Sequence, residues 1–456
     1  MKPAEITSWI GSEQRSSTQT RQVPSPFDGS SIGVVHEANP LDFVQALPLA
    51  KKAQESFAKL PPAERAPVLL RVADQVRQAE SDLAFACALF EGWSQAYALD
   101  KIIRPVERLF RALAQELALK PEDEEGRDAS GLLSIIAPAP MAFRVIGERL
   151  APALAAGNAV LVKVPSHSPI TANLWGEVLR GASVPAGLVS LLVGRGADIG
   201  PLFASHPSVR ALSFAGRPAT AAALARAAGE GHKKSQISGG VKNSLLILPE
   251  TDLDSLPQIL EGVLTGLGRS AFSLSRIFVT ETMAEEFFSR LKTYLATLEP
   301  LHSPGGRSPW TPFADSRGLQ AWEKDRATVG ADRGKLIMAE KEPGSFHLPP
   351  VFARDLTNCS TLQLEETSSP LVIVDTVKYT HEMAKWTNTG DFGFAASIWG
   401  PEDKARRLGA KLQVGQVWIN GWLKGDQAFA GWKKSFFGNP DSRWQGSFYS
   451  DVKTLT

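Results

Sequence analysis

Cysteine is nearly absent from this chain of 456 residues, which contains only Cys87 and Cys359. Two cysteines so far apart in sequence do not make a disulfide framework, and the spacings typical of zinc ligands do not occur. Both thiols are expected to be inert, because buried cysteines behave as small apolar side chains. The chain is therefore predicted to belong to a reducing compartment, the cytoplasm.

An excess of charge of either sign is also missing, since 49 Lys and Arg residues face 48 Asp and Glu residues. This balance gives no general electrostatic attraction to nucleic acid or to an anionic membrane, so neither is predicted as a partner. No apolar run approaches the roughly 18 residues that cross a bilayer. The polar segment 1–21 lacks the features of a signal peptide.

The chain does have the length and the apolar content for more than one core. With 456 residues, of which 43% are hydrophobic, it is expected to form two domains. Residues 23–35 combine Pro and Gly with short apolar pieces, which is typical of turns and edge strands. From residue 41 to about 119, apolar residues recur at spacings of three and four, which predicts helices, and Pro61 and Pro62 separate two of them.

From residue 132 onward, apolar strands alternate with helices, the pattern of βαβ units around a parallel sheet. The first series predicts strands at 132–136, 159–163, 188–193 and 209–214 and helices at 170–180 and 199–205. The second series, after Gly239 and Gly240, predicts strands at 244–248, 276–280, 371–377, 395–399 and 417–420, with helices at 253–267, 284–298 and 319–328.

Short motifs follow one another along nearly the whole chain from about residue 20. They include LAPALAAGN at 150–158, VPAGLV at 184–189, HPSV at 206–209, FAG at 214–216, GG at 239–240 and GQVWIN at 415–420. In order and spacing they resemble the aldehyde dehydrogenase superfamily.

The resemblance implies an α/β aldehyde dehydrogenase fold in three parts. Residues 1–119 and 132–237 would form a Rossmann-like dinucleotide-binding domain, and residues 238–432 an α/β catalytic-type domain. Residues 120–131 and 433–456 would form a small β arm that joins subunits. Because the stretch between 119 and 132 is shorter than usual for the family, a homodimer is favoured over a tetramer.

The family oxidises an aldehyde through a cysteine thiolate that attacks the carbonyl, followed by hydride transfer and hydrolysis of a thioester. When the family's loop motif N-x-G-Q-x-C-x-x-x-x-R is aligned on Gly268 and Arg276, Ala271 takes the place of the nucleophile. Alanine has no lone pair with which to attack. Nearby hydroxyls either substitute for the thiol or only cap the loop, and no base stands beside them in the sequence: Ser270, Ser273 and Ser275.

Two further catalytic groups of the family are also replaced. The general-base glutamate precedes paired glycines in the motif E-L-G-G, whereas this chain reads QISGG at 236–240, with Ile237 as the best match. The oxyanion-holding asparagine of the motif P-W-N-F-P corresponds to Pro140, which offers neither a side-chain donor nor an N–H. The positions of nucleophile, base and oxyanion donor are thus all vestigial in this alignment.

The resemblance also assigns a cofactor site. Lys163 matches the lysine that reaches the adenine ribose, and Gly216 matches the first glycine of F-T-G-S-T-x-x-G, where helix amides receive a pyrophosphate. The family's serine is Arg217 here, followed by Pro218, and the last glycine is Ala221. Arg217 either obstructs the approach of a pyrophosphate or pairs with it through its guanidinium group.

The other end of the cofactor site is equally altered. Glu366 matches the glutamate that holds the nicotinamide ribose, but Ser368 and Ser369 replace a phenylalanine and a glycine, so a plain surface carboxylate is the alternative. Ser166 stands where the family often has an acidic residue near the adenosine ribose, which removes a reason to exclude a 2′-phosphate. The cofactor that the resemblance implies is NAD or NADP.

Together these features favour an aldehyde dehydrogenase-like pseudoenzyme that acts as a binding or scaffolding subunit. One alternative is an NAD(P)-dependent oxidoreductase that acts on an aldehyde by a non-cysteine mechanism. A second alternative is a nucleotide-binding sensor that turns nothing over.

Overall fold

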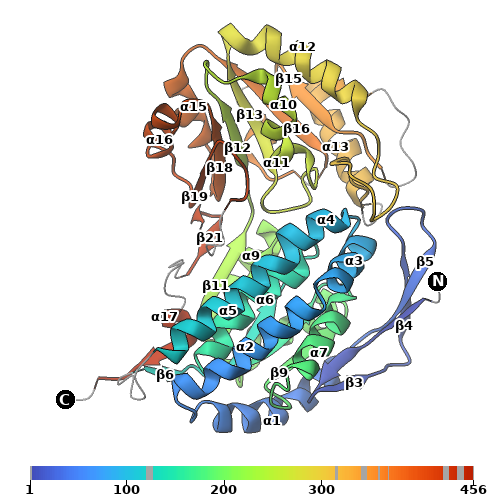
Figure 1. Ribbon diagram of the computed structural model, residues 1–456, viewed down its shortest axis with the longest axis vertical. Coiled ribbons are helices and arrows are strands. Elements are labelled where there is room, and N and C mark those ends of the chain that lie inside the picture. Colours follow the sequence, from blue (N-terminus) through green and yellow to red (C-terminus); the bar gives the residue numbers. More distant parts are fainter. Residues whose placement is uncertain are drawn as a thin grey trace.

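The structure is a computed structural model that describes residues 3–119, 127–313, 317–339, 347–357, 360–367, 369–424, 431–438 and 446–454. Two α/β units lie one above the other, each built around its own sheet (Figure 1). The lower unit contains an eight-stranded sheet and the upper unit a seven-stranded sheet. Within the described ranges no helix is long and apolar enough to cross a membrane.

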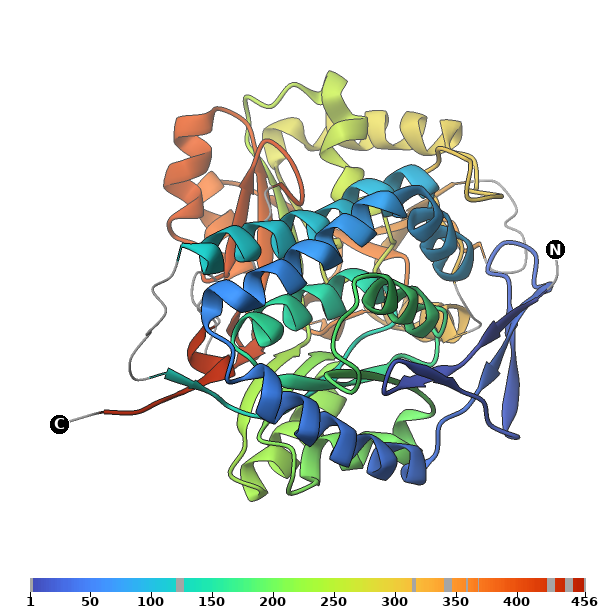
Figure 2. The same ribbon diagram turned by 60° about the horizontal axis from the view of Figure 1, so that its bottom comes forward.

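Five parallel strands form the centre of the eight-stranded sheet, in the order β11 (Lys234–Gly239), β10 (Ala211–Gly216), β7 (Leu132–Ile136), β8 (Ala159–Val164) and β9 (Val189–Val193). Strands β7, β8 and β9 are buried at every position, as expected where helices cover both faces of a sheet. Helices α6 (Ala142–Ala155) and α7 (Thr171–Gly181) cover one face; α1 (Pro40–Phe57), α8 (Gly196–Ser205) and α9 (Pro218–Glu230) cover the other (Figure 2).

The predicted helical region forms α1, α2 (Pro62–Gln78), α3 (Glu80–Glu91), the short α4 (Gln95–Tyr97), a π-helical segment (Ala98–Ile103) and α5 (Arg104–Ala118). Pro62 occupies the first position of α2, where the N–H that it lacks would have had no helical partner. Helices α2 and α5 pack along each other and against α6, as Figure 1 shows.

The amino-terminal segment is more structured than its polar composition indicates. It forms β1 (Ala4–Ile6), β2 (Ser8–Ile10) and β3 (Glu13–Arg15), none of which the sequence pattern predicts. Strand β2 extends the large sheet beside β9 because Trp9 is buried against α7, where a Cβ on Gly176 would lie 2.2 Å from the indole. The edge strands expected within 23–35 are β4 (Thr20–Pro24) and β5 (Ser31–His36), and β5 lies between β1 and β4 in a separate three-stranded sheet.

The seven-stranded sheet has the order β14 (Lys335–Met338), β15 (Val351–Arg354), β16 (Leu371–Val377), β13 (Leu274–Thr280), β12 (Asn243–Ile247), β18 (Ala395–Trp399) and β19 (Gln416–Ile419). All of its pairs are parallel except β14 with β15. Its main helices are α12 (Glu281–Thr297), α13 (Arg317–Ala331), α15 (Thr380–Thr387) and α16 (Glu402–Gly409).

The single helix expected at 253–267 is wrong. This stretch forms a 3₁₀ turn (Leu253–Ser255) and two short helices, α10 (Leu256–Ile259) and α11 (Glu261–Leu264). Leu260 leaves helical geometry with ψ near 0°, and the Trp422 ring packs so closely on Gly262 that a Cβ there would lie 2.4 Å away. The helix is interrupted where the chain packs against the Trp422 indole. The spacing of apolar residues in the sequence does not indicate this interruption.

The carboxyl-terminal strands return to the lower unit. Strand β20 (Trp432–Lys433) pairs with β17 (Phe392–Gly393), β21 (Phe436–Phe437) adds an antiparallel edge to the large sheet beside β11, and β22 (Ser450–Val452) pairs with β6 (Arg127–Ala129). The last pair joins the two segments that the resemblance assigns to an arm. A short helix, α17 (Gly446–Tyr449), precedes β22, and α14 (Thr361–Leu364) lies in the upper unit.

Candidate functional site

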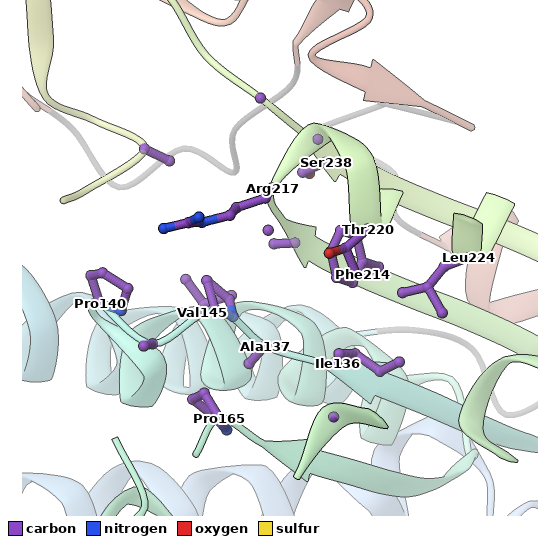
Figure 3. A pocket seen from close by; sticks show the side chains of 18 of the residues that line it. Ile136, Ala137, Pro140, Val145, Pro165, Phe214, Arg217, Thr220, Leu224 and Ser238 are labelled. Carbon is purple, nitrogen blue, oxygen red and sulfur yellow. The ribbon is translucent and has the colours of Figure 1, made fainter. Parts of the chain in front are cut away.

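A cavity of about 840 Å³ opens at the carboxyl-terminal edge of the large sheet. Its wall comes from the ends of β7, β8 and β10, from α6, α8 and α9, and from loops of the upper unit around residues 268–272 and 366. Figure 3 shows side chains from these elements around one space. Open parallel sheets bind ligands at this edge, because helices begin there and point free amides into the crevice.

The structure brings together six of the seven residues singled out in the sequence. Lining the cavity are Pro140, Lys163, Gly216, Arg217, Ala271 and Glu366. The seventh, Ile237, is buried in β11 with 3% of its surface exposed and is not part of the wall. Its neighbours Gln236 and Ser238 line the cavity instead, and the Gln236 Oε1 accepts a hydrogen bond of 3.1 Å from the Ser213 hydroxyl. No carboxylate occupies either register of this strand.

An apolar slot between α8 and α9 forms one end of the cavity. The walls consist of small or aliphatic side chains, and at Gly200 an added Cβ would meet no atom within 4 Å. Open space therefore lies beside Gly200 between the two helices. The residues that line the slot are Gly200, Pro201, Ala204, Ala223, Leu224 and Ala227.

Lys163 stands at the mouth of this slot, at the end of β8. Only 6% of its surface is exposed, and its ammonium group has no hydrogen-bond partner within the described parts of the chain. Burial lowers the pKa of Lys163 to about 8, an effect that nearby Glu37 partly offsets and Arg21 reinforces. A buried amine without a partner, directed into a cavity, is a site for an anion or a hydroxyl group.

The residues around Lys163 are held by their own hydrogen bonds. Arg21 donates to the Glu37 carboxylate at 2.9 Å and to the Ser166 carbonyl oxygen at 2.9 Å. The Ser166 hydroxyl donates to the Gly194 carbonyl oxygen at 2.9 Å, so it already uses its proton within the protein. The Ser166 oxygen therefore faces the cavity as a hydrogen-bond acceptor. The resemblance places an acidic residue at this position.

The amino terminus of α9 faces the same cavity. Arg217 is its N-cap and makes no side-chain capping bond, so the first-turn amides of Ala219 and Thr220 have no helical acceptor. Pro218, at the first position, contributes no N–H. The Arg217 side chain is exposed and extends from the start of α9 into the cavity (Figure 3).

Close packing surrounds both Gly216 at the end of β10 and Ala221 in the first turns of α9. The Phe214 ring covers Gly216, where a Cβ would lie 2.5 Å from the ring. The methyl group of Ala221 faces Gly239 of β11, where a Cβ would lie 2.3 Å from it. Because Gly239 has no side chain, α9 can pack close to the sheet although Ala221, the residue of α9 that faces it, carries a methyl group.

The loop that carries Ala271 is tightly folded. Gly266, Leu267 and Gly268 all have positive φ angles of +83°, +43° and +80°, and a Cβ on Gly268 would lie 2.4 Å from the Ser369 carbonyl oxygen. Ala271 is exposed and presents only a methyl group to the cavity. Its carbonyl oxygen accepts a hydrogen bond of 2.8 Å from Asn243.

Among the described residues, no basic side chain is hydrogen-bonded to Ser270 or Ser273 near Ala271. The Ser270 hydroxyl accepts from the Phe272 N–H at 3.1 Å and donates to the Met141 sulfur at 3.4 Å. Ser273 and Ser275 are not part of the cavity wall. The arrangement agrees with loop-capping hydroxyls. Cys87 is fully buried, and burial raises the pKa of its thiol, whereas Cys359 lies outside the described residues.

A buried carboxylate that the sequence did not single out supports the turn at Pro140. Glu91 accepts from the Met141 N–H at 2.9 Å, from the Trp93 indole at 2.8 Å and from the Ser168 hydroxyl. Burial raises the pKa of Glu91, while these three donors lower it. The only signal in the sequence is a charged residue at the end of the apolar helix at 83–91.

Arg269 connects the Ala271 loop to the same corner. Its guanidinium donates to the Glu91 carbonyl oxygen at 2.7 Å and to the Thr311 hydroxyl at 2.8 Å, and lies 4.2 Å from the centre of the Trp93 ring. The loop of the upper unit is thereby attached to the end of α3 in the lower unit.

Glu366 enters the cavity from the upper unit. Burial raises its pKa to about 7, and the positive charges of Arg217 and Lys242 act in the opposite direction. The Lys242 ammonium group is buried and has no hydrogen-bond partner in the part of the chain that the structure describes, and burial together with Arg276 lowers its pKa to about 7. Arg217 and Glu366 thus interact electrostatically across the boundary between the two units.

The comparison with family models decides the classification, because the model described as "Aldehyde dehydrogenase family" matches residues 9–455. The chain belongs to the aldehyde dehydrogenase family. This confirms the family predicted from the motifs.

Relatives within the aldehyde dehydrogenase family are distant in sequence but match over nearly their full length. The 2-hydroxymuconic semialdehyde dehydrogenase of Pseudomonas sp. (strain CF600) is 28% identical, covering 96% of this chain and 96% of its own. The betaine aldehyde dehydrogenase of Bacillus subtilis (strain 168) is 26% identical, covering 98% and 95%.

Solved aldehyde dehydrogenase structures have the same fold. A structure of an NAD-dependent aldehyde dehydrogenase from Sinorhizobium meliloti has a TM-score of 0.92 at 22% identity, covering 99% of this chain and 94% of that chain. An NAD⁺ complex of an aldehyde dehydrogenase from Bacillus cereus has a TM-score of 0.90 at 23% identity, covering 98% and 96%. The α/β aldehyde dehydrogenase fold is thereby confirmed.

Proposed function

We propose that this chain is an aldehyde dehydrogenase-family pseudoenzyme that binds an adenine nucleotide and does not oxidise aldehydes. The observation that carries the proposal is one cavity with two contrasting ends. One end offers an unpartnered, buried Lys163 beside an apolar slot, and the other presents the methyl group of Ala271.

The loss of aldehyde oxidation is supported by the residues around Ala271. A covalent route needs a nucleophile, a base that activates water and a donor for the oxyanion. Pro140 offers no N–H, and strand β11 presents Gln236 and Ser238 rather than a carboxylate. The removal of one oxyanion donor alone typically costs about a hundredfold to a thousandfold in rate.

Nucleotide binding is supported by the fit between the cavity and such a ligand. The slot between α8 and α9 suits a flat base, Lys163 suits ribose hydroxyls or a phosphate, and the start of α9 suits a phosphate. Relatives described as NAD⁺ complexes make NAD and NADP the first candidates. When bound, the nicotinamide ring supplies a hydride acceptor.

Lys163, Gly216, Arg217 and Glu366 are the residues that would hold such a cofactor. Ser166 presents no negative charge near the ribose, so the site admits a 2′-phosphate as readily as a hydroxyl. On this proposal the protein is a cytoplasmic homodimer that serves as a binding or scaffolding subunit, and the β6–β22 ribbon would form part of the subunit contact.

Calorimetric titration of the full chain with NAD and NADP, followed by an assay for NADH or NADPH with a panel of aldehydes, tests the proposal. Saturable binding without turnover is expected. A flat titration would remove the nucleotide-binding part and leave an empty scaffold. Turnover well above background would instead establish an oxidoreductase with a non-cysteine mechanism.

A further inference from the structure

The centre of the cavity contains a cation that divides it. Arg217 is exposed and lines the cavity, and its guanidinium group makes no hydrogen bond or ion pair within the described residues. Figure 3 shows its side chain leaving the start of α9 and entering the space between the slot and the wall formed by Pro140. A ligand that extends from the slot toward Ala271 must pass this guanidinium group.

Two positive groups flank the route out of the slot. Lys163 lies at its mouth, buried and unpartnered, and Arg217 lies at the start of α9. Between them, α9 offers two free amides rather than three, because Pro218 has no N–H. This set favours a ligand whose negative charge is concentrated near Arg217, since a guanidinium pairs best with a terminal phosphate that offers two free oxygens.

The far side of Arg217 offers little to a second nucleoside. Ala271 and Pro140 provide no side-chain donor, and Glu366 faces the charges of Arg217 and Lys242. A dinucleotide would have to extend past the Arg217 guanidinium group and would gain few new polar contacts beyond it.

We propose that the cavity is specific for a nucleoside diphosphate, with adenosine diphosphate as its model, whose base enters the slot between α8 and α9 and whose terminal phosphate pairs with Arg217. The inference rests on the proposed nucleotide-binding function and narrows it. The nicotinamide half of a dinucleotide contributes nothing to affinity in this account.

The experiment is a set of calorimetric titrations of the full chain with ADP, AMP, ADP-ribose and NAD, repeated on Arg217→Ser. Because only ADP presents Arg217 with a terminal β-phosphate that accepts charge-assisted hydrogen bonds, wild-type protein should bind ADP at least about tenfold more tightly than AMP, ADP-ribose or NAD. Arg217→Ser should weaken ADP about tenfold, leave AMP unchanged and leave NAD unchanged or tighter.

Arg226→Ser is the matched control, because Arg226 is exposed on the same helix and does not line the cavity. It should leave all four affinities unchanged. Arg217→Lys, which keeps the charge, should retain part of the preference for ADP and guards against a folding defect in the serine variant.

Two results would overturn the inference while leaving nucleotide binding intact. NAD could bind as tightly as ADP, or Arg217→Ser could weaken NAD as much as ADP, which would mean that Arg217 grips the pyrophosphate of a dinucleotide. A protein that bound none of the four ligands would overturn both this inference and the proposed function.

Discussion

A methyl group is all that Ala271 presents to the cavity, and this single side chain separates the proposed function from the chemistry of the family. The backbone around it is tightly held: the loop has positive φ angles at 266–268, and Asn243 donates a hydrogen bond to the Ala271 carbonyl oxygen. On the proposed alignment, this ordered loop lacks only the sulfur atom that would attack an aldehyde.

Restoring that atom tests whether the rest of the site could use it. We expect Ala271→Cys to react with iodoacetamide, because residue 271 is exposed to the cavity, and yet to produce no NADH from aldehydes. Neither Pro140 nor β11 would supply the other catalytic groups. Ala222→Cys, at an exposed position of α9 outside the cavity wall, is the control for labelling. Turnover in Ala271→Cys would contradict the account of Pro140 and Gln236.

Lys163 is the residue whose protonation should govern nucleotide affinity. Since burial lowers its pKa to about 8, the ammonium group loses its charge as pH rises through that value, and affinity for an anionic nucleotide should fall. Lys163→Met should weaken binding about tenfold at pH 7 and remove this contribution to the pH dependence. Binding titrations of both proteins from about pH 6.5 to 9.5 check this. Lys242 and Glu366 change charge in both proteins, so the difference between the two pH profiles reports on Lys163.

The lowered pKa of Lys163 also affects the stability of the fold. Rising pH weakens nucleotide binding, but it should stabilise the folded chain. The folded chain binds the Lys163 proton less tightly than the unfolded chain, so burial of the ammonium group destabilises the fold below about pH 8. This cost disappears as pH rises toward the ordinary lysine value. We expect Lys163→Met to be more stable than the wild type at pH 7, with the difference shrinking above about pH 8 in denaturant titrations. A difference that grows with pH would contradict the assignment.

At the scale of elements, Glu91 joins three parts of the lower unit. Its carboxylate accepts from residues at the end of α3, at the start of α6 and before α7. Met141, which begins α6, has a positive φ of 59°, and the bond from its N–H to Glu91 fixes this unfavourable conformation.

Removal of the Glu91 carboxylate should leave several buried donors without an acceptor. We expect Glu91→Ala to lower the free energy of unfolding by about 3 kcal/mol, measured by chemical denaturation. Glu55→Ala, at an exposed site on α1, should change it by less than about 0.5 kcal/mol. Equal effects of the two substitutions would mean that the Glu91 network contributes nothing to stability.

The alternation of strands and helices could be predicted because it is local. Strands β7, β8, β9, β10, β12, β13, β16, β18 and β19 lie within a few residues of their expected positions, since buried parallel strands are continuous apolar runs. Six of the seven residues that the motifs single out line the cavity, although their roles stay predictions.

Other elements depend on distant partners, and the sequence pattern does not reveal them. Strand β2 exists because Trp9 packs on Gly176, and β21 has only two residues and pairs with β11 roughly two hundred positions earlier. The Glu91 network was missed for the same reason, because its donors come from three separate elements. The spacing from Gly239 and Gly240 points to Ile237, but spacing alone does not indicate which side chains of a strand face a cavity.

At the scale of the whole molecule, the β6–β22 ribbon projects from the lower unit toward the carboxyl terminus (Figure 1). Val452 in this ribbon is 73% exposed, which suits a contact with a second copy. We expect light scattering to give about twice the chain mass of 49.1 kDa. Val452→Asp should weaken the dimer, and Val44→Asp, on an exposed face of α1, should not. A monomeric wild type would contradict the assignment of the ribbon.

The two units together form the cavity, and the central claim is that this cavity holds a nucleotide without oxidising an aldehyde. The most direct measurement is a rapid-mixing experiment in which the full chain, saturated with NAD or NADP, meets a panel of aliphatic, aromatic and acidic aldehydes while NADH or NADPH fluorescence is recorded. The account predicts neither a burst nor a steady rate above background for any aldehyde. A burst approaching the concentration of protein, or sustained turnover with any member of the panel, would contradict it.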